Sequence, residues 1–213
     1  MIIARLQRPL AYAALLTLCC GTAHAGDLSF KFNLGANMLA SVPAVTGADV
    51  TPTGASVQPG GGVAVEVGRG RLSLDLGVSR LTRRGSLEYD FRRLGGGTVE
   101  DTTEFSYVEV PILVRVHLGR VSLGAGGYVD KAVGTFQSAL SGNLAFDDVS
   151  ASGLKSTSMG LMTSLAVDLP VHSRFSVVLD SRYAHGLSDL SMTRSASWKT
   201  RDLQAFVGIR LHR

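Results

Sequence analysis

A histidine and a serine close together in the sequence could form a hydrolytic site. His185 and Ser188 are three positions apart, and Asp180 and Asp189 lie on either side of them. A serine nucleophile needs a histidine base within hydrogen-bond reach, oriented by a third group. His185 is expected where a strand enters a loop, and no local motif brings Ser188 within its reach. The sequence therefore predicts no catalytic residue, and lipid hydrolysis with His185 in the site stays an alternative.

Four charged residues could instead form a relay for protons or for a substrate. Glu109 and Arg115 belong to one expected strand, and Asp180 and Arg182 belong to another. All four are predicted to face the interior of the fold. Buried charges that lack a partner are costly, so charges of both signs in one interior pair with one another. We therefore favour ion pairs that fill the interior over a relay.

Other segments lack the spacing that metal or phosphate binding requires. Asp147-Asp148 could indicate a Ca²⁺ site at the cell surface, but regularly spaced oxygen ligands are missing. Gly95-Gly96-Gly97 is not followed by Lys-Ser/Thr and has no strand–helix context. The remaining histidines have no spacing typical of metal ligands. We expect no metal site and no cofactor.

Strands must position these residues, because apolar side chains recur at every second position. Between Leu28 and Met38, for example, apolar residues alternate with polar or small ones, which is typical of a strand with two unlike faces. Seven more segments have the same period. The predicted strands cover about 28–38, 57–67, 72–79, 104–118, 121–133, 158–169, 175–183 and 203–211.

Short and long connections alternate between these strands. Gly68-Arg69-Gly70, Gly119-Arg120 and the segment 170–173 predict tight turns. Long connections are expected over about 41–56, 83–103 and 134–156, and again after the seventh strand. An outer-membrane barrel has short periplasmic turns and long extracellular loops, whereas a soluble sandwich has no reason to sort its turns in this way. Most predicted strands also approach the ~9–11 residues that a tilted strand needs to cross a membrane.

The two faces of the strands predict which side meets lipid. The face opposite the apolar residues carries charges of both signs and many glycines and serines, which suit the crowded interior of a narrow barrel. We therefore expect the polar face inside and the apolar face outside. A soluble periplasmic β-barrel that holds an apolar ligand would reverse them and is the alternative. The charged residues predicted to point inward are Glu66, Asp75, Glu109, Arg115, Asp168, Asp180 and Arg182.

The first residues have the three parts of a secretory signal. Arg5 and Arg8 form a basic region, an apolar run extends from Leu10 to Cys20, and Ala23-His24-Ala25 fits a cleavage site. The run is shorter than the ~20 residues of a transmembrane helix. We predict a signal peptide over residues 1–25 and an outer-membrane β-barrel domain over residues 26–213. Both cysteines, Cys19 and Cys20, lie in the predicted signal, so no disulfide is expected in the mature chain.

Charge and aromatic residues limit the expected partners. The formal net charge of +4 becomes +2 without Arg5 and Arg8, and no basic cluster has the interleaved aromatic residues typical of nucleic-acid binding. Basic residues near turns are expected to be solvated or to face anionic headgroups, namely Arg69, Arg71, Arg83, Arg84, Arg92 and Arg93. Residues expected in aromatic belts at the membrane interfaces are Phe30, Phe32, Tyr89, Phe91, Phe105, Tyr107, Phe175, Tyr183 and Trp198.

Three segments follow the patterns of a known family. The segment 107–115, YVEVPILVR, is similar to the pattern Tyr-x-Glu-(Ile/Val)-Pro-(Leu/Ile)-Leu-x-(Lys/Arg) of PorT-like outer-membrane β-barrel proteins. The glycine-rich segment 123–128 and the segment 180–189 fit the same family. The resemblance implies a fold and a location, but little about activity. One departure is the ending Leu211-His212-Arg213, where many such barrels have an aromatic residue that the assembly machinery recognises.

These features together predict an all-β protein, an eight-stranded antiparallel up-and-down transmembrane β-barrel in the outer membrane of a Gram-negative bacterium. Side chains just fill the interior of an eight-stranded barrel, so general diffusion through it is not expected. The expected role is structural or interactive, with loops displayed outside the cell. The expected partners are outer-membrane lipid and lipopolysaccharide, the assembly machinery, and an extracellular or envelope protein bound through the loops, but not nucleic acid.

Overall fold

Eleven strands make up the described part of the fold, and eight of them are long. The computed structural model describes residues 27–39, 44–45, 49–90, 97–142, 156–189, 196–197 and 199–212. The long strands are β1 (Asp27–Leu39), β4 (Val57–Arg69), β5 (Leu72–Asp90), β6 (Thr98–Leu118), β7 (Val121–Gly142), β8 (Thr157–His172), β9 (Phe175–Gly186) and β11 (Arg201–His212). The short strands are β2 (Ala44–Val45), β3 (Asp49–Ala55) and β10 (Ala196–Ser197).

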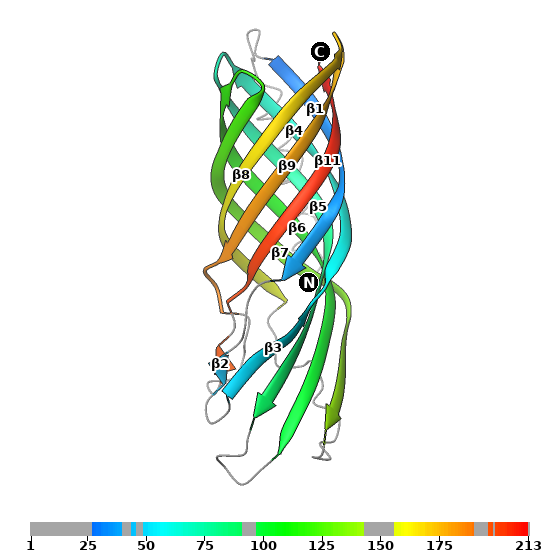
Figure 1. Ribbon diagram of the computed structural model, residues 1–213. Coiled ribbons are helices and arrows are strands. Elements are labelled where there is room, and N and C mark those ends of the chain that lie inside the picture. Colours follow the sequence, from blue (N-terminus) through cyan, green and yellow to red (C-terminus); the bar gives the residue numbers. More distant parts are fainter. Residues whose placement is uncertain are drawn as a thin grey trace, which may run out of the picture.

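The eight long strands close into a barrel (Figure 1). Sequential neighbours pair antiparallel, and the ring closes where β11 pairs with β1. β3 adds to β5 beyond the reach of β4, and β2 pairs with β10. The predicted up-and-down barrel is confirmed. The described residues include no helix with the length and apolarity needed to span a membrane.

Side chains alternate between the lumen and the outer surface as predicted. On β6, Ile112 and Val114 are 51% and 55% exposed, whereas Leu113 between them is 1% exposed. Glu109 and Arg115, on the same face as Leu113, are completely buried. The apolar face therefore points outward and the charged face lines the interior. A soluble barrel with an apolar cavity would need the reverse arrangement, so that alternative is not supported.

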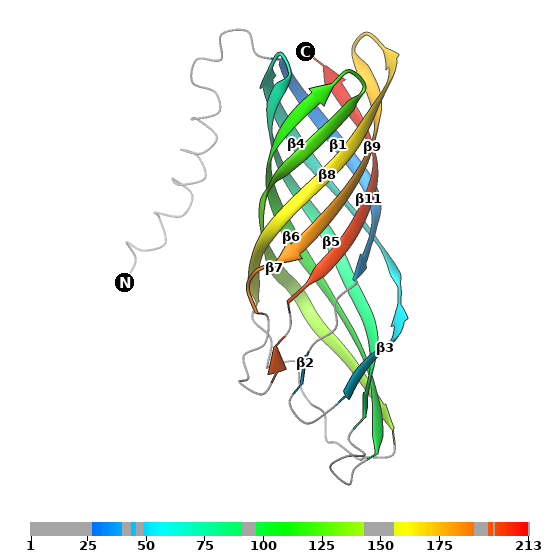
Figure 2. The same ribbon diagram turned by 60° about the vertical axis from the view of Figure 1, so that its left-hand side comes forward.

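The three short turns lie together at one end of the barrel, which we call the turn end (Figure 2). They connect β4 to β5, β6 to β7, and β8 to β9. Gly70 and Gly119 adopt φ angles of 64° and 69° in the first two. L-residues avoid this left-handed region, and glycine enters it without steric cost. The predicted separation of short turns from longer connections is thereby confirmed.

At the opposite end, which we call the mouth, part of the sheet continues past the barrel (Figures 1 and 2). This projecting sheet consists of β3 with residues 84–90 of β5, 98–104 of β6 and 134–142 of β7. The predicted long connections over 83–103 and from residue 134 are therefore strand over residues 83–90, 98–103 and 134–142, which sequence analysis had not assigned to strands. The predicted loop 41–56 likewise contains β2 and β3. Strands outside the membrane need no apolar face, so the period-two hydrophobic signal is lost there.

Several predicted features lie outside the described residues. They are the signal peptide over residues 1–25, Gly95-Gly96, Phe91, Arg92, Arg93, Asp147-Asp148 and Trp198.

Candidate functional site

Ion pairs fill the half of the lumen toward the turn end. Arg115 of β6 lies between two carboxylates from other strands, with Nε 2.6 Å from Asp75 Oδ2 and Nη2 2.8 Å from Asp180 Oδ2. Arg182 Nη2 lies 3.0 Å from the same Asp180 oxygen. The structure therefore brings Arg115, Asp180 and Arg182 together, as predicted for inward-facing charges.

Glu66 of β4 is a second centre of this network. Its Oε2 lies 2.9 Å from both Lys31 Nζ and Arg210 Nη2. Its Oε1 accepts a hydrogen bond of 2.7 Å from the Ser73 hydroxyl, and His117 Nε2 lies 2.8 Å away from it. Lys31 and Arg210 extend the network to Asp75 and Asp168 respectively. The turn-end network thus comprises Lys31, Glu66, Asp75, Arg115, Asp168, Asp180, Arg182 and Arg210.

These eight residues carry four basic and four acidic groups, so their formal charges balance. A buried ion pair stabilises a fold only when geometry and additional hydrogen bonds compensate for lost hydration. Here each carboxylate meets at least one cation at 3.0 Å or less. The network joins β1, β4, β5, β6, β8, β9 and β11 across the lumen. Its arrangement supports the interpretation of interior ion pairs.

A smaller group, the mouth cluster, lies toward the projecting sheet. Arg83 is 1% exposed, and its Nη2 lies 2.9 Å from Asp130 Oδ2. Its Nε donates a hydrogen bond of 2.9 Å to Asp202 Oδ2. The guanidinium also lies 3.7 Å from the centre of the Tyr107 ring, which is a favourable cation–π geometry. The prediction that Arg83 is solvated is wrong, because its strand continues and turns it inward.

Glu109 occupies the lumen between these two groups. Its carboxylate accepts hydrogen bonds of 3.0 and 3.3 Å from the Gln204 amide. The four residues considered for a relay are therefore not one linked group in the structure. Three of them share the Asp180 contacts, and Glu109 is bound to an amide instead.

Two clusters of apolar side chains also lie in the described lumen, beside further buried polar residues such as Asn37 and Ser164. One cluster contains Leu39, Leu81, Phe105, Tyr107 and Phe206, and a second contains Leu113, Tyr128, Met162 and Ala184. Arg182 lies 4.8 Å from the centre of the Phe206 ring, so the apolar and charged groups are in contact. The interior combines ion pairs with packed apolar side chains, as a small eight-stranded barrel does.

Sequence analysis missed five members of the two charged groups. Four of them had a usable signal, and three of these, Lys31, Asp202 and Arg210, alternate with outward neighbours in their strands. Asp130 also has the inward parity of the fifth predicted strand. Arg83 had no such signal, because it follows the last outward valine of β5 and was assigned to a loop. The missed residues are Lys31, Arg83, Asp130, Asp202 and Arg210.

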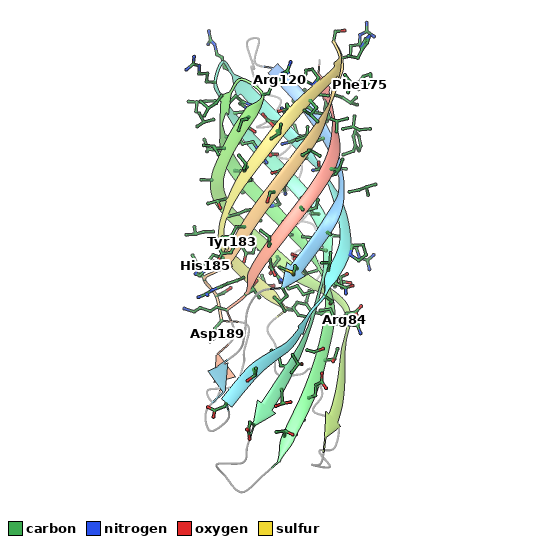
Figure 3. The ribbon with its side chains drawn as sticks, viewed as in Figure 1. Arg84, Arg120, Phe175, Tyr183, His185 and Asp189 are labelled. Carbon is green, nitrogen blue, oxygen red and sulfur yellow. The ribbon has the colours of Figure 1, made fainter. Side chains whose placement is uncertain are left out.

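The residues considered for hydrolysis lie on different sides of the barrel wall. Asp180 points into the lumen and is 4% exposed. Tyr183 and His185 lie on the outer surface near the mouth, with ring centres 6.5 Å apart (Figure 3). The Ser188 hydroxyl is bound to the backbone of Met159, from whose amide it accepts a hydrogen bond of 2.8 Å. The structure does not assemble these side chains into a nucleophile, base and carboxylate.

The predicted aromatic belt is partly wrong. Phe30, Phe32 and Tyr183 face outward and are 43%, 54% and 43% exposed. Phe105 and Tyr107 instead point into the lumen, where they contact Arg83. Phe105 and Tyr107 lie on the same inward face of β6 as Glu109, so their rings cannot meet lipid. Phe175 is half-buried at the turn end (Figure 3).

The described residues contain no group of three or more His, Cys, Asp or Glu side chains placed to hold a metal ion. The balanced lumen and the outward apolar band are instead the features of a membrane barrel. The profile of the outer membrane protein beta-barrel domain family matches residues 22–191 of this sequence. The chain belongs to this family. No sequence among curated proteins matches it.

Solved structures of outer-membrane proteins are similar in fold. The attachment invasion locus protein Ail of Yersinia pestis, solved with the heparin analogue sucrose octasulfate, is 13% identical with a TM-score of 0.44. That match covers 88% of this chain and 99% of Ail. OprG of Pseudomonas aeruginosa is 14% identical over 89% of this chain and 96% of its own, with a TM-score of 0.49. The outer membrane protease OmpT of Escherichia coli is 10% identical over 88% of this chain and 97% of its own, with a TM-score of 0.42.

Family membership is consistent with the outward apolar face, and it places the protein in the outer membrane. The specific likeness to PorT-like proteins stays a prediction.

Proposed function

We propose that this family member is a non-conducting barrel that displays the projecting sheet for binding to an extracellular protein. The lengths of the strands support this role. β5, β6 and β7 contain 19, 21 and 22 residues, whereas β9 and β11 contain 12 each. About 9–11 residues suffice to cross a membrane. The excess length of three neighbouring strands is gathered in one structure outside the barrel.

Pairing and hydrogen bonds hold the projecting sheet in a defined shape. β5 and β6 remain paired as far as Asp90 and Thr98. The hydroxyls of Ser86 and Thr102 lie 2.8 Å apart across these strands, and Thr53 of β3 donates a hydrogen bond of 3.2 Å to Glu100. A sheet ordered in this way binds with a smaller loss of conformational entropy than a flexible loop.

The two edges of the projecting sheet differ in their suitability for a partner. β3 has Pro52 next to a register shift, and Asp49 near its end. Proline, bulges and charges protect a sheet edge from pairing with another chain. Residues 134–142 of β7 contain no charge and no proline, and within the described chain they pair with β6 alone. The β7 edge is therefore the better site for an added strand from a partner protein.

Removal of the projecting hairpin tests this function. Replacing residues 84–104 by Asn-Gly keeps the membrane part of β5 and β6 and closes it with a favoured two-residue turn. We expect cells that display this variant to lose adherence to immobilised extracellular-matrix proteins, while cells with the unaltered chain adhere. A mobility shift between boiled and unboiled samples in SDS gels controls for barrel closure. Equal adherence by both proteins would refute the proposal.

A catalytic function is not favoured. The candidate nucleophile Ser188 is held by Met159, and the candidate carboxylate Asp180 binds two arginines inside the lumen.

A further inference from the structure

Basic side chains end the outward apolar columns of the barrel near the mouth. On β5, outward Leu72, Leu74 and Val78 are followed by exposed Arg80. On β7, outward Val121, Leu123 and Val129 are followed by exposed Lys131. On β11, the outward column from Leu211 to Leu203 reaches exposed Arg201, and Lys199 is exposed two positions further. Three strands therefore change from apolar to basic where the barrel meets the projecting sheet.

The register of the strands brings these cations into two groups. Arg80 and Lys131 both pair with Val108 of β6, from opposite sides. Neighbouring strands are about 4.8 Å apart, so the two backbones are separated by about 10 Å and both side chains can reach one anion between them. In the second group, Arg201 lies directly across from His185 of β9. Tyr183, next along the outward column from His185, adds an aromatic ring at the same border (Figure 3).

Neighbouring charges leave this arc of the surface basic. Arg84 lies 3.6 Å from Glu104, so that pair is neutral. Asp189 is half-buried beside the second group. The remaining two strands of the ring differ, because the described outward positions of β1 and of β4 near the mouth are uncharged, including Leu34, Val57 and Pro59. The basic positions therefore fall on the part of the ring that runs from β5 to β11, in two groups separated by β8, whose outward positions near the mouth, Thr157 and Met159, are uncharged.

The height of the arc determines which ligand it meets. Val78, Val129 and Leu203, each two positions along its strand from Arg80, Lys131 and Arg201 respectively, are 48%, 48% and 46% exposed and face acyl chains. Long connections and projecting structure belong to the extracellular side of such barrels. The lipid at this border is therefore that of the outer leaflet, and cations at a membrane interface attract anionic headgroups. A phosphorylated glycolipid combines acyl chains with anions at the required heights.

We propose that two groups of cations, Arg80 with Lys131 and Lys199 with Arg201, bind the phosphates of lipid A, the membrane anchor of lipopolysaccharide, on the part of the barrel wall that runs from β5 to β11. His185 and Tyr183 border the second group. The acyl chains of the bound lipid lie along the outward apolar columns of the same strands.

Charge removal at the two ends of the barrel tests the proposal. The site variant carries R80Q, K131Q, K199Q and R201Q. The control variant carries R69Q, R71Q, R120Q and R174Q, which remove the same charge from exposed positions at the turn end. Each full-length protein is folded in detergent, checked for the heat-dependent mobility shift, and titrated with purified lipid A in native mass spectrometry. The same titration uses lipid A from which phosphates have been removed.

We expect the site variant to bind lipid A at least about tenfold more weakly than the unaltered protein. The control variant should bind like the unaltered protein, and removal of the phosphates should weaken binding to the level of the site variant. Equal binding by the site variant, equal loss in both variants, or equal binding of the dephosphorylated lipid would each overturn the proposal. Adherence through the projecting sheet is measured separately, so either proposal can fail alone.

Discussion

At the scale of residues, two neighbouring arginines show that the contribution of a charged side chain to stability depends on which face of the strand it occupies. Arg83 and Arg84 are adjacent, but their side chains lie on opposite sides of the wall. Arg83 is enclosed and holds Asp130 and Asp202 from β7 and β11. The Arg84 side chain is 49% exposed and lies 3.6 Å from Glu104. Solvent screens the exposed Arg84–Glu104 pair. The buried carboxylates of Asp130 and Asp202 have no water that could take the place of the Arg83 guanidinium.

We predict that Arg83→Met strongly destabilises the barrel. The substitution leaves two buried carboxylates without their shared cation, and removal of one partner from a buried ion pair costs about 3–5 kcal/mol. Equilibrium urea unfolding in phospholipid vesicles measures the loss.

The matched control is Arg84→Met, the same substitution one position away. An exposed pair contributes at most about 1 kcal/mol, so this variant should unfold close to the unaltered protein. If the two variants proved equally stable, the mouth cluster would not contribute to stability as described.

At the scale of elements, sequence analysis predicted the strands in the membrane and missed those outside it. The eight barrel strands and their inward faces follow from the alternation of apolar residues, as in β6 from Val108 to Val116. The projecting sheet lies beyond the barrel and carries only scattered apolar residues, such as the buried Leu87 and Val99, so its sequence has no sustained alternating pattern. Charged residues such as Glu66 and Arg115 were placed inward by parity, but their partners could not be predicted. Partners depend on the register and closure of the ring, which brings Glu66 to Arg210 from 144 positions away.

The turn glycines allow a prediction at this scale. Gly119 has a φ of 69°, and nothing lies within 4 Å of the position that a Cβ would take. Gly119→Ala should therefore act through backbone strain alone and lower the free energy of unfolding by about 1–2 kcal/mol. Gly127→Ala in β7 is the control, because its Cβ would meet the Gly160 carbonyl oxygen at an ordinary distance of 3.4 Å. Urea midpoints at unchanged slope compare the two, and a larger loss in the control would contradict the strain argument.

At the scale of the whole molecule, the barrel combines a filled interior with an unequal exterior. Arginines, carboxylates and two apolar clusters occupy the lumen, while the outside has an apolar band with basic residues at its borders. The projecting sheet extends from one end only (Figure 1). These features describe a molecule anchored in lipid whose contacts with other molecules lie on its outer surfaces.

We predict that the purified protein in planar bilayers shows no large and stable conductance. Side chains fill an eight-stranded barrel and leave no continuous aqueous path of the kind found in barrels with 16–18 strands. A porin in the same bilayers confirms that channels are detected. A large, steady conductance from the folded protein would disprove the filled lumen.

The pairing of β1 with β11 has a consequence for the order of biogenesis. β11 closes the ring and brings Asp202, Gln204 and Arg210 into the lumen, where their partners are on strands made much earlier. Until that strand arrives, Arg83, Glu109 and Glu66 each lack a bond that the finished barrel gives them. Each hairpin can form as its turn is made, but the contacts of Arg83 with Asp202, of Glu109 with Gln204 and of Glu66 with Arg210 join strands that are not neighbours in the ring. We therefore expect the closed barrel, with its inward charges paired, to form only after β11 has been delivered to the membrane.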